Sequence, residues 1–176
     1  DVVDLSVGEP DFPTPEHICR AAEEAIRAGF TKYTPAAGIP ALRKAVAEDY
    51  TRRTGLAVTP AQVVVSNGAK HALHNVFTAV LDEGDEVVVP APFWVSYAAL
   101  ADVALEADLA VVADEIYDQL VFDGRTSPSF PTLRPGLESR TVVVAGVSKT
   151  YSMTGWRIGW TIAPEPLSKA IGNLQS

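Results

Sequence analysis

The sequence predicts an α/β protein with a mostly parallel sheet and helices on both of its faces. Short runs of β-branched apolar residues, such as those at 63–65 and 142–144, alternate with segments whose apolar residues recur at helical spacing. A strand without polar alternation is typical of a sheet that is buried on both faces, and parallel strands need crossover helices between them. With 176 residues, of which 47% are hydrophobic and 20% charged, the chain can bury a sizeable core.

The composition excludes several classes of partner. Twenty-two acidic residues against 14 basic ones give a net charge of −8, which argues against a nucleic-acid-binding surface. The single cysteine, Cys19, excludes an intrachain disulfide and suits a reducing compartment. No apolar run approaches the roughly 20 residues that cross a bilayer. We therefore expect a cytoplasmic protein without a membrane or nucleic-acid partner.

The first part of the chain is expected to be an extended lead-in followed by two helices. Three prolines by position 15 exclude a helix over residues 1–14, and Thr14 with Pro15 provides an N-cap and a first helical residue. The first helix ends at Gly29. A loop that holds Tyr33 follows, and then a second amphipathic helix that ends at Gly55. We divide the chain into this lead-in and first helix, residues 1–30, and a large domain over residues 31–176.

Strands and helices then alternate. The four predicted strands cover residues 63–65, 86–90, 109–113 and 142–147. The predicted helices run from the turn at 66–70 to about residue 81, from 99 to 108, and from near 166 to the end of the chain. Residues 122–138 are rich in Pro, Gly and Ser and are expected to be mostly loop.

Residues with reactive or ligand-binding side chains follow each predicted strand. The strands lead into the small-residue turn at 66–70, Trp94, Asp114 with Tyr117, and Ser148 with Lys149. Ligands of open α/β sheets bind beyond the carboxyl ends of the strands, so we expect these residues to meet at one edge.

The combined chemistry of these residues suits one cofactor. A turn of small residues before a helix exposes backbone N–H groups and binds anions, although the phosphate-loop and dinucleotide fingerprints are both absent. Lys149 at a buried strand end is partly desolvated and can act as a nucleophile, and the guanidinium of Arg157 suits a phosphate. A carboxylate for a pyridinium nitrogen, a stacking surface and a phenol complete what pyridoxal phosphate requires.

Other chemistries find less support. His17, His71 and His74 lack the spacing and carboxylate partner of a metal site, and neither a Ser-His-Asp set nor a Gly-x-Ser-x-Gly elbow is recognisable. Taken singly, each candidate has an ordinary interpretation. A strand-end lysine is usually solvated, a tyrosine or tryptophan usually packs in the core, and Gly8 can be a simple turn residue.

With these motifs in hand, the sequence resembles the fold-type I pyridoxal-phosphate aminotransferases. The similarity is strongest to the class I subgroup that contains bacterial aspartate and aspartate/prephenate aminotransferases. The motifs that carry it are residues 6–12, the loop at 33–38, and the segments 66–70, 92–94, 113–117 and 148–159.

The resemblance assigns roles at the cofactor ring. It implies that Lys149 forms the Schiff base and later moves the proton in the 1,3-prototropic shift. Asp114 would pair with the ring nitrogen and Tyr117 with the ring's phenolic oxygen. Trp94 would stack on the ring and, with Gly8, contact the substrate.

The resemblance also implies a phosphate site and a second subunit. The residues implied around the phosphate are Gly68, Ala69, Lys70, Ser148 and Arg157. Tyr33 would reach the phosphate of a neighbouring subunit, so a homodimer is expected.

The sequence departs from the family in two places. Between Tyr97 and Ala98 the family carries a long segment with an Asn-Pro motif that contacts cofactor and substrate. The chain also ends before the small C-terminal domain that supplies the arginine for the substrate's α-carboxylate. Two explanations fit: a longer enzyme of which these residues are a part, or a deletion product.

The expected reaction is the transfer of an amino group between aspartate and 2-oxoglutarate by a ping-pong mechanism. The alternatives are a pyridoxal-phosphate-binding module without turnover, another pyridoxal-phosphate reaction such as β-elimination or decarboxylation, and a plain α/β interaction domain. The amino-acid preference is not predicted, because the residues that would read the side chain lie largely in the missing segments.

Overall fold

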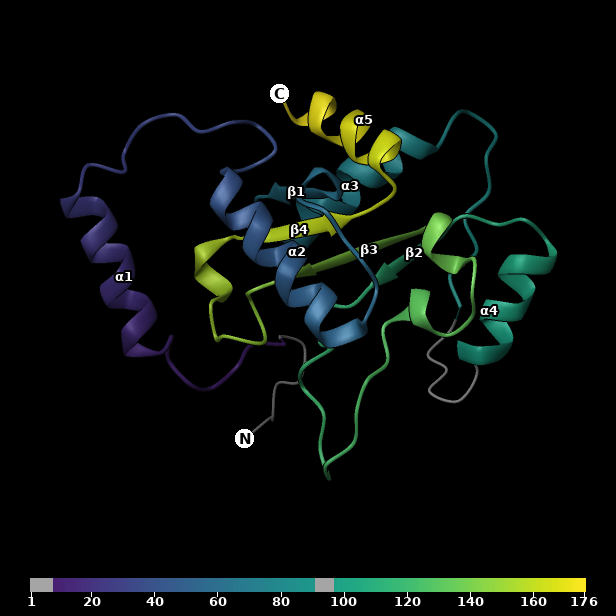
Figure 1. The fold of residues 1–176 in the computed structure, drawn as a ribbon, viewed down its shortest axis with the longest axis horizontal. Helices are drawn as coiled ribbons and strands as arrows, with labels where there is room; N and C mark the ends of the chain where they lie inside the picture. Colours follow the sequence, from purple (N-terminus) through teal and green to yellow (C-terminus); the bar gives the residue numbers. More distant parts are fainter. Residues whose placement is uncertain (1–7, 91–96) are drawn as a thin grey trace, which may run out of the picture.

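A four-stranded sheet with the strand order β1-β4-β3-β2 forms the centre of the molecule (Figure 1). The computed structural model describes residues 8–90 and 97–176. Its strands are β1 (Val63–Ser66), β2 (Val111–Asp114), β3 (Thr141–Gly146) and β4 (Gly159–Ile162). β2 and β3 pair in parallel, while β4 lies antiparallel to both β1 and β3. Three strands therefore point the same way, and β1, β2 and β3 all end at one edge.

The described part of the chain contains five α-helices. They are α1 (Glu16–Arg27), α2 (Pro40–Thr54), α3 (Ala69–Val80), α4 (Tyr97–Glu106) and α5 (Glu165–Gln175). The predicted end of α2 is confirmed, because Gly55 ends the helix in the left-handed conformation at φ 77°. Pro40 occupies its first position.

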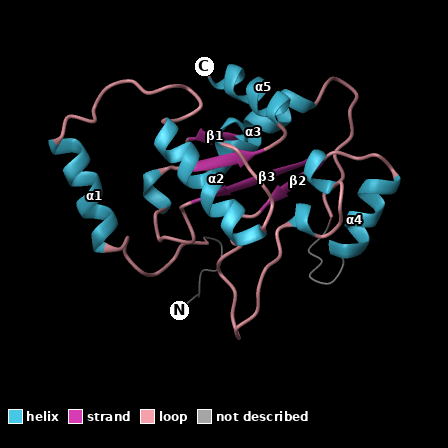
Figure 2. Ribbon diagram, viewed as in Figure 1, coloured by secondary structure: helices cyan, strands magenta, loops and turns pink. Residues whose placement is uncertain are grey.

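The sheet lies between two helical layers (Figure 2). Successive side chains of a strand point to opposite faces, so Val142 and Val144 contact one layer and Val143 contacts the other. The layer formed by α3 and α5 packs Ala72, Val76 and Ile171 against the first face. The other layer is α2, which buries Val46, Ala47 and Tyr50 against the second face. The predicted α/β class with helices on both faces is thus confirmed, with a mixed sheet.

Two helices lie outside this core. α1 is joined to the rest by long loops and buries no residue against the described part of the chain (Figure 1). α4 packs Ala101 and Ala104 against Leu137, beside the β2 edge of the sheet. None of the helices in residues 8–90 and 97–176 has the length and apolarity needed to span a membrane.

One strand prediction was wrong and one strand was missed. Residues 86–90 form no strand, and the side chains of Val88 and Val89 are more than 80% exposed. A strand needs a hydrogen-bonded neighbour, and no other segment within the described ranges pairs with this one. β4 was not predicted, because Gly159 and Thr161 interrupt its apolar pattern.

Candidate functional site

The candidate site lies where β1, β2 and β3 end. The parallel register places Asp114, the last residue of β2, opposite Val144 of β3. β3 continues to Gly146 and leads into a turn that contains Ser148 and Lys149. Ser148 is buried, and its carbonyl accepts a hydrogen bond of 3.1 Å from the Met153 N–H, which closes this turn. The parallel strands β2 and β3 thus place a carboxylate and an amine at the same edge of the sheet.

Lys149, Tyr117 and Gly8 come together at this edge. The Lys149 Nζ donates a hydrogen bond to the carbonyl of Gly8 and lies 5.7 Å from the centre of the Tyr117 ring. A Cβ at residue 8 would lie 2.9 Å from the Tyr117 hydroxyl, so a residue with a side chain would crowd the phenol. Gly8 therefore permits the close approach of the lead-in to the phenol and the amine.

A cationic side chain lies at the start of α3. Gly68 precedes the helix at φ +86°, and a Cβ there would collide with the guanidinium of Arg157. Arg157 also has a left-handed backbone, at φ 56°, and its Nη1 donates a hydrogen bond of 2.9 Å to the Thr154 carbonyl. A side chain at Gly159 would collide with the backbone N of Ala69. The guanidinium and the positive end of the α3 dipole therefore lie together, an arrangement that binds anions.

Asp114 has an unusual electrostatic environment. The residue keeps an exposed face, but the surrounding protein desolvates its carboxyl and raises its pKa. A hydrogen bond of 3.2 Å from the Ile116 N–H to Oδ1 opposes this effect. A carboxylate that is costly to ionise is stabilised by a cationic partner, and a protonated ring nitrogen is such a partner.

The lead-in is fastened across the turn that carries Lys149. Thr154 donates a hydrogen bond of 2.6 Å to Glu9, and Thr14 donates one of 2.6 Å to the Ser152 carbonyl. The indole N–H of Trp156 donates to Thr14 at 3.1 Å. Thr14 was expected to cap the first helix, but that helix begins at Glu16 and the Thr14 hydroxyl bonds the Ser152 carbonyl instead. These roles of Glu9 and Thr14 were not predicted, because the contacts join residues 138 to 145 positions apart and leave no local signal.

The remaining predicted site residues lie in different environments. Ala69 begins α3, and Lys70 is exposed on the first turn of that helix. Tyr33 is fully exposed in the loop between α1 and α2 and joins neither group. Trp94 lies outside the described residues. No cluster of His, Cys, Asp and Glu suited to a metal ion occurs in the part of the chain that the structure describes.

Comparison with known proteins gives one consistent family. The sequence matches the family described as aminotransferase class I and II over residues 1–101 and 97–176. The aspartate aminotransferase of Geobacillus stearothermophilus is 37% identical over 234 positions, which cover all of this chain and 60% of that protein. The aspartate/prephenate aminotransferase of Thermus thermophilus is also 37% identical, with the same coverage.

Solved structures agree with these relatives. The Thermus thermophilus aspartate aminotransferase with maleate superposes with a TM-score of 0.89 at 35% identity, covering 98% of this chain and 59% of that one. The Thermotoga maritima aspartate aminotransferase gives a TM-score of 0.90 at 32% identity, covering 100% and 62%.

The chain spans about 60% of the length of the curated relatives it matches. Part of the difference is internal, because the alignments run over 234 positions although the chain has 176 residues. The two family matches meet at residues 97–101. This is where the sequence analysis expected a segment to be missing, between Tyr97 and Ala98.

Proposed function

The chain belongs to the class I and II aminotransferases, and from this membership we propose that it is the cofactor-binding part of a pyridoxal-phosphate-dependent aspartate aminotransferase. The reaction proposed is the transfer of an amino group between aspartate and 2-oxoglutarate in two half-reactions. The observation that carries the proposal is the meeting of the Lys149 amine with the Tyr117 phenol at the ends of β3 and β2. The names of the relatives support aspartate as the amino donor.

The described residues fit pyridoxal phosphate chemically. Lys149 supplies an amine for the cofactor's aldehyde, and Asp114 supplies a carboxylate in surroundings that favour a cationic partner. Tyr117 supplies a phenol beside that amine. The guanidinium of Arg157 at the start of α3, next to Gly68, supplies the site for a dianionic phosphate.

Each residue then has a defined task. When bound, pyridoxal phosphate supplies an aldehyde that reacts with amines and a ring that withdraws electrons. Lys149 would hold the cofactor through its Nζ, and that atom would accept and return a proton when it is free. Asp114 would keep the ring nitrogen protonated, and Tyr117 would donate a hydrogen bond to the ring oxygen. Arg157 and the first N–H groups of α3 would orient the phosphate.

The proposal includes a homodimer. Tyr33 is fully exposed, which suits a residue that contacts a second subunit rather than its own core. The proposed partners are therefore a second copy of the chain, an amino acid and a 2-oxo acid.

A second candidate function is cofactor binding without turnover. It is favoured by the internal segment that the relatives have and this chain lacks near residue 97. The two candidates predict the same cofactor attachment and differ in the response to substrate.

The test is to add pyridoxal phosphate, reduce the complex with borohydride and locate the modified lysine by peptide mass spectrometry. Modification is expected at Lys149 and should vanish in Lys149→Ala, while Lys169→Ala, which alters an exposed lysine of α5, should leave it unchanged. Absence of modification at Lys149 would overturn both candidates. Aspartate should then change the cofactor's spectrum and, with 2-oxoglutarate, yield oxaloacetate; a silent spectrum would select the second candidate.

A further inference from the structure

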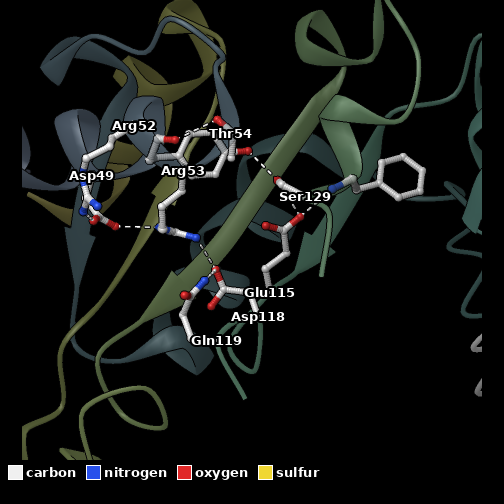
Figure 3. Close-up of polar contacts among 10 residues, drawn as sticks. Asp49, Arg52, Arg53, Thr54, Glu115, Asp118, Gln119 and Ser129 are labelled. Atoms are coloured by element: carbon white, nitrogen blue, oxygen red, sulfur yellow. Dashed lines mark hydrogen bonds and ion pairs between the residues drawn. The ribbon is translucent and has the colours of Figure 1, made fainter. Parts of the chain in front are cut away.

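The segment that follows β2 has two chemically different sides. Asp114 and Tyr117 belong to the candidate site, whereas the side chain of Asp118 contacts Arg53 of α2 and that of Glu115 contacts Ser129, just before η2 (Phe130–Thr132) (Figure 3). A hydrogen bond of 3.1 Å from the Asp118 N–H to the Glu115 carbonyl closes the turn between them. The turn therefore links Asp114 and Tyr117, on the side of the candidate site, to Glu115 and Asp118 on its other side.

Glu115 is anchored in a half-buried polar chain. Its Oε1 accepts hydrogen bonds of 2.9 Å from the Ser129 hydroxyl and 2.8 Å from the Phe130 N–H. The Ser129 oxygen lies 2.6 Å from the Tyr50 hydroxyl, which donates to it because Ser129 donates to Glu115. Tyr50 and Ser129 are both buried, so this chain is shielded from competing water.

Asp118 is anchored on the other side of the turn. Its Oδ2 lies 2.7 Å from Nη1 of Arg53, in the last turn of α2 (Figure 3). Arg53 also pairs with Asp49 through Nε at 2.8 Å. The side chains of Asp118 and Arg53 are 13% and 26% exposed, so the pair is better shielded than an ordinary surface ion pair.

The two site residues have few anchors of their own. The Asp114 carboxyl accepts a hydrogen bond from the Ile116 N–H, within the same turn, and Tyr117 is about half exposed. The side chains of Glu115 and Asp118 make the hydrogen bonds that connect this turn to other elements within the described residues. A backbone hydrogen bond of 2.7 Å from the Glu115 N–H to the Val144 carbonyl adds to them.

We propose that Glu115 and Asp118 are positioning residues for the cofactor site. By fixing the turn to Ser129, Phe130 and Arg53, they hold the Asp114 carboxylate and the Tyr117 phenol toward Lys149. This inference rests on the proposed function, and neither residue touches cofactor or substrate. Removing an anchor should alter the orientation of the two site residues while leaving Lys149 in place.

The first measurement is hydrogen exchange at residues 114–118 in the protein without cofactor. Glu115→Ala and Arg53→Ala should speed exchange of these amides about tenfold, because each removes a tie to a neighbouring element. Glu115→Gln should stay within about twofold of the wild type, since its amide oxygen can still accept both hydrogen bonds. Arg52→Ala is the matched control, because Arg52 sits on the same helix turn, has an exposed side chain and, within the described residues, pairs only with Asp49.

The second measurement is titration with pyridoxal phosphate followed by absorbance. Glu115→Ala and Arg53→Ala should weaken binding about tenfold and shift the cofactor spectrum toward that of Asp114→Asn or Tyr117→Phe, while Lys149 is still modified at saturation. If Glu115→Ala does not fold, the milder Ser129→Ala and Tyr50→Phe variants carry the same test.

The outcomes separate the two proposals. Faster exchange with an unchanged affinity and spectrum, or no change in either measurement, would overturn the positioning role. A wild-type protein whose Lys149 takes no cofactor would overturn the proposed function, and the exchange experiment would then decide the anchoring by itself.

Discussion

The Nζ atom of Lys149 lies 5.7 Å from the centre of the Tyr117 ring, although the two residues follow different strands. The parallel pairing of β2 with β3 produces this relationship, because Asp114 and Val144 are in register and both strands end at one edge. The turn after each strand then directs one residue toward the other. The site is thus a consequence of strand direction and register, and substitutions around it have separable effects.

Gly68→Ala should separate backbone strain from cofactor binding. Gly68 and Gly55 both have positive φ, +86° and +77°, but ψ is 163° at Gly68 and −6° at Gly55. Alanine should therefore cost about 1 kcal/mol of unfolding free energy at Gly55 and about 2–3 kcal/mol at Gly68, whose backbone conformation is almost exclusive to glycine. A Cβ meets nothing within 4 Å at Gly55 but meets the flexible end of Arg157 at Gly68. We expect a larger loss in urea unfolding for Gly68→Ala than for Gly55→Ala, and a weaker affinity for pyridoxal phosphate in Gly68→Ala alone. Equal affinities would show that the Arg157 guanidinium is not part of the phosphate site.

Tyr50 should make stability fall at alkaline pH. Burial raises the pKa of the Tyr50 phenol to about 12, above the ordinary value of 10. Because the folded state favours the neutral phenol, this contribution is complete below pH 10 and is lost between about pH 10 and 12, and it amounts to about 2–3 kcal/mol. The stability difference between wild type and Tyr50→Phe, measured by urea unfolding, should shrink over this interval. A constant difference would contradict the prediction.

The carboxyls of Asp114 and Glu115 should affect the unfolding free energy at acidic pH. Desolvation by burial raises the pKa of both groups, while hydrogen bonds from Ile116 and Phe130 oppose it. A raised carboxyl pKa favours folding at low pH, so this contribution is lost as the pH rises through the raised values. Asp114→Asn should therefore flatten the pH dependence of unfolding free energy below neutrality in the protein without cofactor.

Cofactor binding should oppose the upward shift of the Asp114 pKa. A cationic ring nitrogen lowers the pKa of a neighbouring carboxyl, so stabilisation by pyridoxal phosphate should be larger at pH 7 than at pH 4 in the wild type. The stabilisation is measured as the rise in melting temperature on adding the cofactor, at pH 7 and at pH 4. In Asp114→Asn this rise should differ less between the two pH values, and an unchanged difference would place the ring nitrogen elsewhere.

Gln175 should be a stability hot spot near the end of α5. Its amide N–H groups donate to the carbonyls of Ala36 at 2.5 Å and Val65 at 2.7 Å, and its oxygen accepts from Ser66 and Asn75. Gln175→Ala leaves several of these groups without a partner, so we expect a loss of about 2–3 kcal/mol in unfolding free energy. Asn173→Ala, two residues earlier and exposed, is the control and should change little.

Local signals in the sequence predicted most of the individual elements. Proline at the start and glycine at the end of α2 act within a few residues, and the apolar run of β3 is buried at every position. The run at residues 86–90 also holds three consecutive valines but forms no strand, because pairing depends on a neighbour that local sequence does not reveal. β4 shows the reverse case, because it forms a strand despite a weak apolar pattern. Its hydrogen-bonded partners on both sides, β1 and β3, compensate for that pattern.

The candidate site shows the same division. Lys149, Asp114 and Tyr117 could be predicted because each follows a recognisable strand. The hydrogen-bond partners of Glu115 could not be predicted, because Ser129 lies in a segment expected to be loop and its partner Tyr50 is 79 residues away. Hydrogen bonds across such separations follow from the completed fold and have no signature in either segment alone.

The proposed phosphate role of Arg157 would place folding and ligand binding under opposing selection. A left-handed backbone at a non-glycine residue costs about 1 kcal/mol, and glycine at this position would recover it. In a laboratory lineage selected for folding alone, position 157 should drift toward glycine or asparagine. In a lineage that must retain a phosphate ligand, arginine should persist despite its cost. The residue found at this position after many generations would therefore report which of the two pressures the lineage has experienced.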